Sequence, residues 1–253
     1  MKIALLSDIH ANLPALEAVL ADIDERNPDQ IYCLGDLVSY APQPNEVVEL
    51  IRQRKIPTIA GNHDEFIGLS PHGPKLHPIE EGVSNGTISK AYTNQILSFE
   101  SRTFLKQLPR HFKLDFQFNE EAFSFLMVHG SPRKINEYIF EDHEEEDLLS
   151  MMQNEKASIL AFGHTHKPFH RILKDEKENY HHAINLGSVG KPKDDDNRAC
   201  YVMLEITDQT SMKRPDGLKV EFIRVPYDIE KVATQIENSP LPDVYADMLR
   251  KGY

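Results

Sequence analysis

Three short apolar runs near the start of the chain are each followed at once by residues that bind metals or transfer protons. The runs span 3–7, 31–34 and 57–60, and helical patterns at 13–24 and 45–54 separate them. Short apolar runs without polar alternation are typical of buried parallel strands. Strands that alternate with helices predict right-handed βαβ crossovers. Because ligands bind at the carboxyl ends of such strands, we expect these polar residues to meet at one edge of a sheet.

Two later predicted strands end in the same way. The run 122–128 leads into His129, and the run 158–162 leads into His164 and His166. The full set of strand-end residues is Asp8, His10, Asp36, Asn62, His63, His129, His164 and His166. Taken singly, Asp-x-His or His-x-His arises often by chance and is explained by packing. The repeated placement after predicted strands favours a functional site.

The chemistry of this set predicts a pair of metal ions. Carboxylate and amide oxygens together with imidazole nitrogens suit divalent ions such as Mn²⁺, Fe²⁺ or Zn²⁺. The set contains no cysteine, which argues against a structural zinc site. It has too many ligands for one catalytic ion, whereas two ions about 3.5–4 Å apart, sharing a carboxylate and a hydroxide, would use them all. Such a pair is suited to in-line attack on a phosphoryl group.

Composition limits the possible partners and the compartment. The chain has 253 residues, enough for one domain with a full core, and a formal charge of −12. That charge argues against binding to a nucleic-acid polymer or an anionic membrane. The two cysteines, Cys33 and Cys200, suggest no disulfide framework. The apolar run before Asp8 is too short for a signal peptide, and no run approaches membrane length, so we expect a cytoplasmic protein.

The rest of the chain predicts further elements around this edge. Helices are expected at 84–99 and 101–108, a hairpin of strands at 112–118 and 122–128, an acidic helix start at 141–147, strands at 199–206 and 218–225, and a helix at 228–237. A loop rich in proline and glycine is expected at 70–86, and a surface segment from Pro240 onward. We expect one domain over 1–253, in which residues 66–107 form a helical, cap-like insertion.

These motifs resemble those of the calcineurin-like metallophosphoesterase superfamily. The resemblance rests on Asp8-x-His10, Gly35-Asp36, Gly61-Asn62-His63-Asp64, the His129 segment and Gly163-His164-Thr165-His166, and it extends from Met1 to about Tyr201. The stretches 35–45, 185–190 and 197–199 are similar to small prokaryotic phosphoesterases related to diadenosine tetraphosphatase and Ser/Thr protein phosphatases. Ala11 and Lys193 depart from the common glycine and arginine, but neither is a ligand position. The resemblance implies a mixed α/β fold, a two-sheet αββα sandwich with the metals at one edge.

The resemblance also implies a role for each motif residue. The first ion would be held by Asp8, His10 and His166, the second by Asn62, His129 and His164, and Asp36 would bridge the two. His63 would protonate the leaving oxygen as a general acid. Asp64 would either orient that imidazole or be a surface carboxylate without a role. Manganese is the favoured metal, with iron, zinc, nickel or magnesium as alternatives.

Three residues are candidates for contact with the substrate. Arg198 and Lys193 carry charges suited to phosphate. Lys193 opens an acidic run, however, and a solvated turn is the favoured explanation there. Asn12 follows the first predicted strand near the first ion, and helix capping is its simpler explanation.

Three functions are compatible with these patterns. The first is a metal-dependent phosphoesterase that hydrolyses a small phosphodiester, phosphomonoester or nucleotide. The second is a Ser/Thr phosphoprotein phosphatase, which would need an open peptide groove. The third is a non-catalytic scaffold like the retromer subunit that keeps this fold with an incomplete site. The complete ligand set and the presence of His63 rank the scaffold last.

Overall fold

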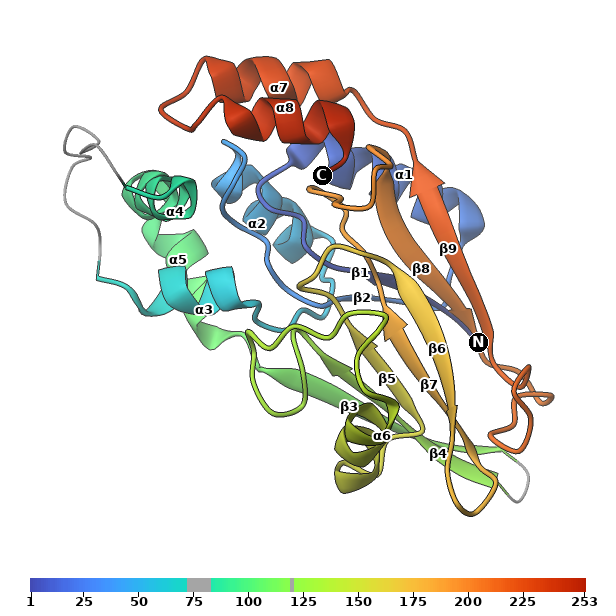
Figure 1. Cartoon of the computed structure of the whole chain (residues 1–253). Helices are drawn as coiled ribbons and strands as arrows, with labels where there is room; N and C mark the ends of the chain where they lie inside the picture. The colour runs from blue at the N-terminus through green and yellow to red at the C-terminus, as the bar shows by residue number, and fades with distance from the viewer. Residues whose placement is uncertain (72–82, 119–120) are drawn as a thin grey trace.

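The computed structural model of the chain describes residues 1–71, 83–118 and 121–253 (Figure 1). Within them, one sheet has the strand order β2-β1-β8-β9 and the other has the order β3-β4-β5-β7-β6. The first sheet contains β1 (Lys2–Leu6), β2 (Gln30–Cys33), β8 (Ala199–Glu205) and β9 (Lys219–Val225). The second contains β3 (His111–Phe118), β4 (Glu121–Val128), β5 (Ile159–Phe162), β6 (Phe169–Lys174) and β7 (Tyr180–Asn185). Strands β1 and β2 are parallel, as are β4, β5 and β7.

The two sheets share one apolar core. Leu5 and Val202 of the first sheet cluster with Phe125, Met127 and Ile184 of the second, and all five side chains are fully buried. Strands buried on both faces carry continuous apolar runs, which explains why the runs around β1 and β5 lack polar alternation.

Helices cover the outer face of each sheet. Helices α1 (Leu13–Arg26) and α2 (Pro44–Gln53) pack on the first sheet, and α6 (Glu145–Asn154) packs on the second. Helix α7 (Ile229–Glu237) contacts α1 and pairs with α8 (Val244–Lys251). Helices α3 (Asn62–Leu69), α4 (Asn85–Ile96) and α5 (Phe99–Gln107) lie together at one side of the sandwich (Figure 1). The predicted two-sheet αββα architecture is therefore confirmed. No helix in the described ranges is long and apolar enough to span a membrane.

Helix α1 shows how local sequence positions the metal edge. The side chain of Asn12 accepts a hydrogen bond from the amide of Ala15 at 3.1 Å, and Pro14 lies in the first turn. The buried face of the helix packs on β1 through Leu16, Val19, Leu20 and Ile23. The helix therefore begins directly after the loop that carries Asp8 and His10.

Several expected elements differ from the structure. Residues 57–60 form no strand and contribute only an isolated bridge between Thr58 and Cys33. This bridge consists of hydrogen bonds from Cys33 to the carbonyl of Pro57 and from Ile59 to the carbonyl of Cys33, both at 3.0 Å. The helix expected at 101–108, with a serine cap at its start, is α5 (Phe99–Gln107); its cap is Ser98, whose side chain accepts a hydrogen bond from the Ser101 amide at 3.0 Å.

The segment from Pro240 onward is not a plain surface tail. It forms α8, which buries Tyr245, Ala246 and Leu249 against α7 and neighbouring loops. Helix α3 and strand β6 were not predicted. The expected loop at 70–86 and the cap-like insertion at 66–107 both include residues 72–82, which lie outside the described residues, as do the hairpin residues 119–120.

Candidate metal centre

The loops after four strands and the start of α3 bring seven predicted ligands to one edge. Two groups have ligand atoms within 4.8 Å of one another, and every member is buried: Asp8, His10 and His166 in the first, and Asp36, His129 and His164 in the second. Asn62 adjoins the second group, since its Oδ1 lies 3.2 Å from Nε2 of His129. Oδ2 of Asp36 lies 3.7 Å from Nε2 of His10 and 3.3 Å from Nε2 of His129, between the two groups.

Backbone carbonyls set the tautomer of three histidines. Nδ1 of His10 donates to the carbonyl of Val38 at 3.0 Å, and Nδ1 of His166 donates to that of Lys191 at 2.5 Å. Nδ1 of His129 donates to the carbonyl of Leu34 at 2.8 Å. Because a carbonyl only accepts, each Nδ1 carries a proton and each Nε2 offers a lone pair in the neutral ring. Such second partners are typical of metal-bound histidines.

The facing nitrogens fit a cation between them. Nε2 of His10 and Nε2 of His166 lie 3.1 Å apart, each on a ring whose Nδ1 already holds the proton. Two lone pairs at that distance repel unless a positive charge lies between them. His129 differs: burial opposes its protonation, but the charge of Asp36 and a hydrogen bond to that carboxylate raise the pKa of His129 to about 10, so its Nε2 can donate to the amide oxygen of Asn62 at 3.2 Å.

The two carboxylate oxygens of Asp8 have different surroundings. Oδ2 of Asp8 accepts hydrogen bonds from the Ser7 hydroxyl at 2.7 Å and the His164 amide at 3.0 Å. Its Oδ1 faces Nε2 of His166 at 3.1 Å and has no hydrogen-bond partner. Nε2 of His164 is also buried without a partner. Orphaned buried polar atoms are costly, and a bound metal ion in each group would satisfy them.

The ligand loops adopt an uncommon backbone conformation. Left-handed φ angles occur at Asp8 (55°), His10 (50°), Asp36 (54°), His164 (66°) and His166 (62°). Such conformations are unfavourable for residues with a side chain and concentrate at functional sites. Ala11 shares this conformation with φ of 57°, which explains why glycine is common there in related sequences.

Two glycines allow loops to approach the carboxylates closely. A Cβ atom on Gly61 would lie 2.1 Å from Oδ1 of Asp36, and one on Gly163 would lie 2.3 Å from Oδ2 of Asp8. Any side chain at either position would therefore displace a carboxylate.

Charges within the site keep both aspartates ionised. Burial raises the pKa of Asp8, but the neighbouring His166 and other imidazoles outweigh it and hold the pKa well below its usual range. Burial also raises the pKa of Asp36, and His129 and His63 outweigh it in the same way. Anionic carboxylates at neutral pH are the form that binds cations.

His63 and Asp64 lie beside this edge but make no mutual hydrogen bond. The His63 side chain is 6% exposed, and its Nδ1 has no partner. Asp64 is fully buried, so it is not a surface carboxylate. Its oxygens accept the backbone amides of Leu37 at 2.9 Å and Gly61 at 3.0 Å, so Asp64 supports the loops rather than the imidazole. Burial, then the charge of Asp36, raises the pKa of Asp64 to about 7.

The candidate substrate contacts differ in their availability. Asn12 donates to the carbonyl of Gly190 at 2.9 Å and to the hydroxyl of Tyr227 at 3.2 Å, so both amide hydrogens are engaged. Arg198 is exposed and pairs with Asp196 at 2.6 Å, so phosphate contact would require breaking that pair. Lys193 is half-buried rather than in a solvated turn. Burial lowers its pKa, while the nearby carboxylates of Asp8 and Asp36 act in the opposite direction.

Some residues at this edge carried no recognisable sequence signal. Lys191 is 5% exposed, and burial together with the Lys193 ammonium lowers its pKa to about 7. Tyr245 of α8 contacts Tyr40, with ring centroids 5.1 Å apart. Tyr138 stacks on the His164 imidazole at 4.2 Å. The place of each of these residues at the edge depends on contacts between segments that are far apart in the sequence. Lys191 alone could have been noticed, because it directly follows the 185–190 stretch that resembles the family.

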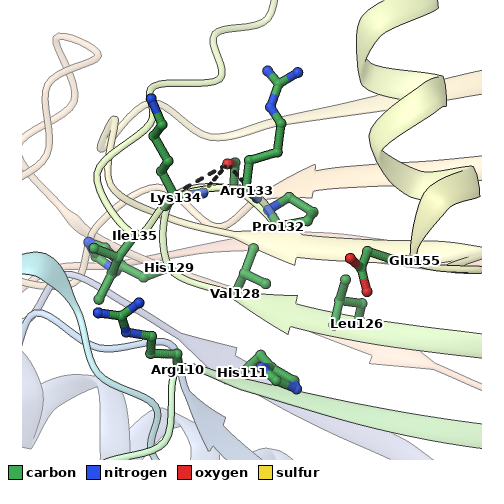
Figure 2. A pocket seen from close by; sticks show the side chains of 11 residues that line it. Arg110, His111, Leu126, Val128, His129, Pro132, Arg133, Lys134, Ile135 and Glu155 are labelled. Carbon is green, nitrogen blue, oxygen red and sulfur yellow. Dashed lines mark hydrogen bonds between the residues drawn. The ribbon is translucent and has the colours of Figure 1, made fainter.

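Two hollows adjoin the second group. One, of about 190 Å³, lies under the turn that follows β4 and contacts His129 (Figure 2). The Ser131 hydroxyl accepts hydrogen bonds from the backbone amides of Arg133 and Lys134, both at 3.0 Å, and these bonds stabilise the turn (Figure 2). The other hollow is an open groove of about 650 Å³ that begins at Asn62 and runs along α3. Ile135 lines both.

Comparisons with known proteins agree with this geometry. An uncharacterised protein of Methanocaldococcus jannaschii, MJ0912, is 33% identical, and the alignment covers 99% of this chain and 98% of that protein. The phosphodiesterase YfcE of Escherichia coli K12 is 26% identical, over 81% of this chain and 88% of YfcE. A crystal structure of a metallophosphoesterase from Sphaerobacter thermophilus superposes with a TM-score of 0.75 at 29% identity, over 100% of this chain and 99% of that one.

The family match covers most of the chain. The calcineurin-like phosphoesterase superfamily domain matches residues 1–209, a range that contains every ligand of both groups. It agrees with the motifs at Asp8, Asp36 and His164 and with the two-sheet fold. The chain therefore belongs to the calcineurin-like phosphoesterase superfamily.

Proposed function

We propose that this protein is a dinuclear metal-dependent hydrolase of small phosphoesters, with phosphodiesters as the favoured substrates. The observation that carries the proposal is the pair of buried Asp-His-His groups with Asp36 between them. The family binds divalent metals, and the lone pairs that face one another at 3.1 Å fit such ions. A bound pair of ions would polarise the phosphoryl group and activate a water for attack. Manganese suits the mixed oxygen and nitrogen ligands.

Each side chain at this edge would have a separate role in metal binding or proton transfer. Asp8, His10 and His166 would hold one ion and Asn62, His129 and His164 the other, while Asp36 would contact both. His63 would donate a proton to the leaving oxygen. Burial lowers the pKa of His63 to about 3, so its imidazole is neutral in the free protein. A phosphate anion beside the ring would raise that pKa, because an opposite charge favours the protonated form.

Two observations support a small organic phosphoester as substrate. YfcE, a relative over most of the chain, is named a phosphodiesterase. The groove of about 650 Å³ that begins at Asn62 includes Phe66 and Lys90, from α3 and α4 of the helical insertion. The insertion would then line the substrate site rather than seal it. We also propose a cytoplasmic location, because both cysteines are free and buried.

The test is hydrolysis of bis-p-nitrophenyl phosphate beside p-nitrophenyl phosphate. The protein is stripped with a chelator and assayed before and after Mn²⁺ is restored, together with the variants His63→Ala and His143→Ala. His143 pairs with Asp147 at 2.8 Å and belongs to neither ligand group, so it is a matched control. Metal content is measured in parallel by elemental analysis.

We expect diester turnover that requires Mn²⁺, is retained in His143→Ala and falls by about 100-fold or more in His63→Ala. Turnover of the monoester alone would favour a phosphatase. Full activity in the stripped protein, or no turnover of either ester by protein that holds two ions per chain, would contradict the proposal.

A further inference from the structure

Lys191 is a buried cation without an anionic partner. Its side chain is 5% exposed, and its ammonium lies 5.3 Å from the ring centroid of Tyr40 and 6.0 Å from that of Tyr245. No carboxylate in the described residues lies within ion-pair distance of Lys191. Cation–π contacts attract an ammonium only weakly compared with a carboxylate. A buried lysine is normally paired, so this one needs an explanation.

The nearby acidic run does not neutralise Lys191 or Lys193. Asp194 pairs with Arg224. Asp196 pairs with Arg198 at 2.6 Å and approaches Arg224 at 3.7 Å. Asp195 is exposed to solvent. The acidic residues that follow Lys193 are thus either engaged with arginines or turned outward, and none of them forms an ion pair with Lys191 or Lys193.

Both lysines lie beside the first group of ligands. The carbonyl of Lys191 accepts the hydrogen bond from His166, and the amide of Lys193 donates to the carbonyl of His166 at 3.3 Å. The Tyr40 ring that contacts the Lys191 ammonium is also 4.7 Å from the His10 ring and 4.9 Å from the His63 ring. The Tyr40 ring therefore contacts the Lys191 ammonium, the predicted ligand His10 and the predicted proton donor His63.

We propose that Lys191 and Lys193 form a subsite for a second phosphate group of the substrate, next to the phosphoester that is cleaved. The inference rests on the proposed function and narrows it to substrates with two neighbouring phosphates, such as a nucleoside diphosphate group. Tyr40 and Tyr245 act as positioning residues, because their rings hold the Lys191 side chain at the metal edge. The second phosphate would give Lys191 the anionic partner that no ion pair in the described part of the chain supplies.

The experiment compares two ligands that differ by one phosphate. AMP and ADP are tested as inhibitors of bis-p-nitrophenyl phosphate hydrolysis at a fixed excess of free Mn²⁺, and their binding to the Mn²⁺-loaded protein is measured by calorimetry. The proteins are wild type, Lys191→Met, Lys191→Arg and the control Lys167→Met. Lys167 is exposed, follows His166 and acts on Lys193 only through its charge, so its variant removes one positive charge near the site and leaves both subsite lysines in place.

In the wild type we expect ADP to bind at least about 10-fold more tightly than AMP, because charge-assisted hydrogen bonds to phosphate are strong. Lys191→Met should remove most of this preference, whereas Lys191→Arg and Lys167→Met should retain it. Equal affinities for AMP and ADP in the wild type would overturn the inference. So would a Lys191→Met variant that loses turnover but keeps the preference for ADP. If the wild type fails to hydrolyse the diester, the proposed function fails, while calorimetry still tests the subsite.

Discussion

Oδ1 of Asp36 accepts a hydrogen bond of 2.8 Å from the backbone amide of His63. The carboxylate that lies between the two ligand groups therefore also holds the start of α3, where the predicted proton donor is located. Its other oxygen faces the imidazoles of His10 and His129. One side chain thus fixes the position of His63 relative to the two candidate ligand groups.

The substitution Asp36→Asn tests this double role. An amide loses the negative charge, and one of its two terminal atoms can only donate, so it cannot both bridge two ions and accept the His63 amide. We expect metal content to fall from two ions per chain to one or fewer, and diester turnover to fall by about 1000-fold. Elemental analysis and bis-p-nitrophenyl phosphate hydrolysis measure both. Asp195→Asn, at an exposed position, should change neither; retention of two ions in Asp36→Asn would refute the bridging role.

The substitution His63→Asn separates proton donation from metal binding. The variant should keep both ions, because His63 belongs to neither ligand group. A nitrophenolate leaves without much help, whereas an alkoxide needs a proton, so the loss should be larger for an ester with an alcohol leaving group. We expect turnover of the nitrophenyl ester to fall by about 100-fold and turnover of the alkyl ester by about 10⁴-fold, which is the range of general acid catalysis. Equal losses for both esters would exclude His63 as the acid.

Arg102 links helices α3, α4 and α5. Its buried guanidinium donates to the carbonyls of Ile67 at 2.5 Å, Asn94 at 2.9 Å and Ser70 at 3.1 Å, and burial lowers its pKa. Arg102→Met leaves these carbonyls without a donor and should lower the free energy of unfolding by about 3 kcal/mol. Hydrogen exchange should show the loss of protection in α3, α4 and α5 first.

Arg110→Met is the matched control for this prediction. Arg110 is 68% exposed and pairs with Glu65 at the surface, so its loss should cost less than about 1 kcal/mol. If Arg102→Met lowers the free energy of unfolding by no more than Arg110→Met does, the three helices are held together by apolar contacts alone.

Asp175 gives the stability of the β6–β7 hairpin a dependence on pH. Burial raises the pKa of Asp175, but hydrogen bonds from Asn179 and then His181 outweigh it and lower the pKa to about 2. The folded state therefore favours the ionised carboxylate, and its contribution is complete above the usual pKa near 3.8 and lost as the pH falls through 2.

The substitution Asp175→Ala should accordingly destabilise the protein by about 1–3 kcal/mol at pH 7, the cost of leaving its donors unpaired. The difference in the free energy of unfolding between wild type and Asp175→Ala, measured with urea, should stay constant from about pH 7 to 5 and become smaller below about pH 4. Asp216→Ala, at an exposed position, should show no such trend. A difference between wild type and Asp175→Ala that widens toward low pH would contradict this assignment.

The sequence by itself determined where the strands at this edge end and which candidate ligands follow them. The apolar runs of β1, β2 and β5, each followed by Asp8, Asp36 or His164, are local patterns, and the burial of a strand depends mainly on such patterns. The same applies to the hairpin of β3 and β4, which was predicted correctly. Residues 57–60 had an equally apolar pattern but form only the isolated bridge between Thr58 and Cys33.

The tertiary structure decided how the edge is assembled. The carbonyls of Val38 and Lys191 set the tautomers of His10 and His166, and the fold buries Asp64 on the amides of Leu37 and Gly61. Helix α8 brings Tyr245 onto Tyr40 and the Lys191 ammonium. None of these relationships has a local signal, because each depends on the distance and burial of segments that meet only when the two sheets and the carboxyl-terminal helices pack together.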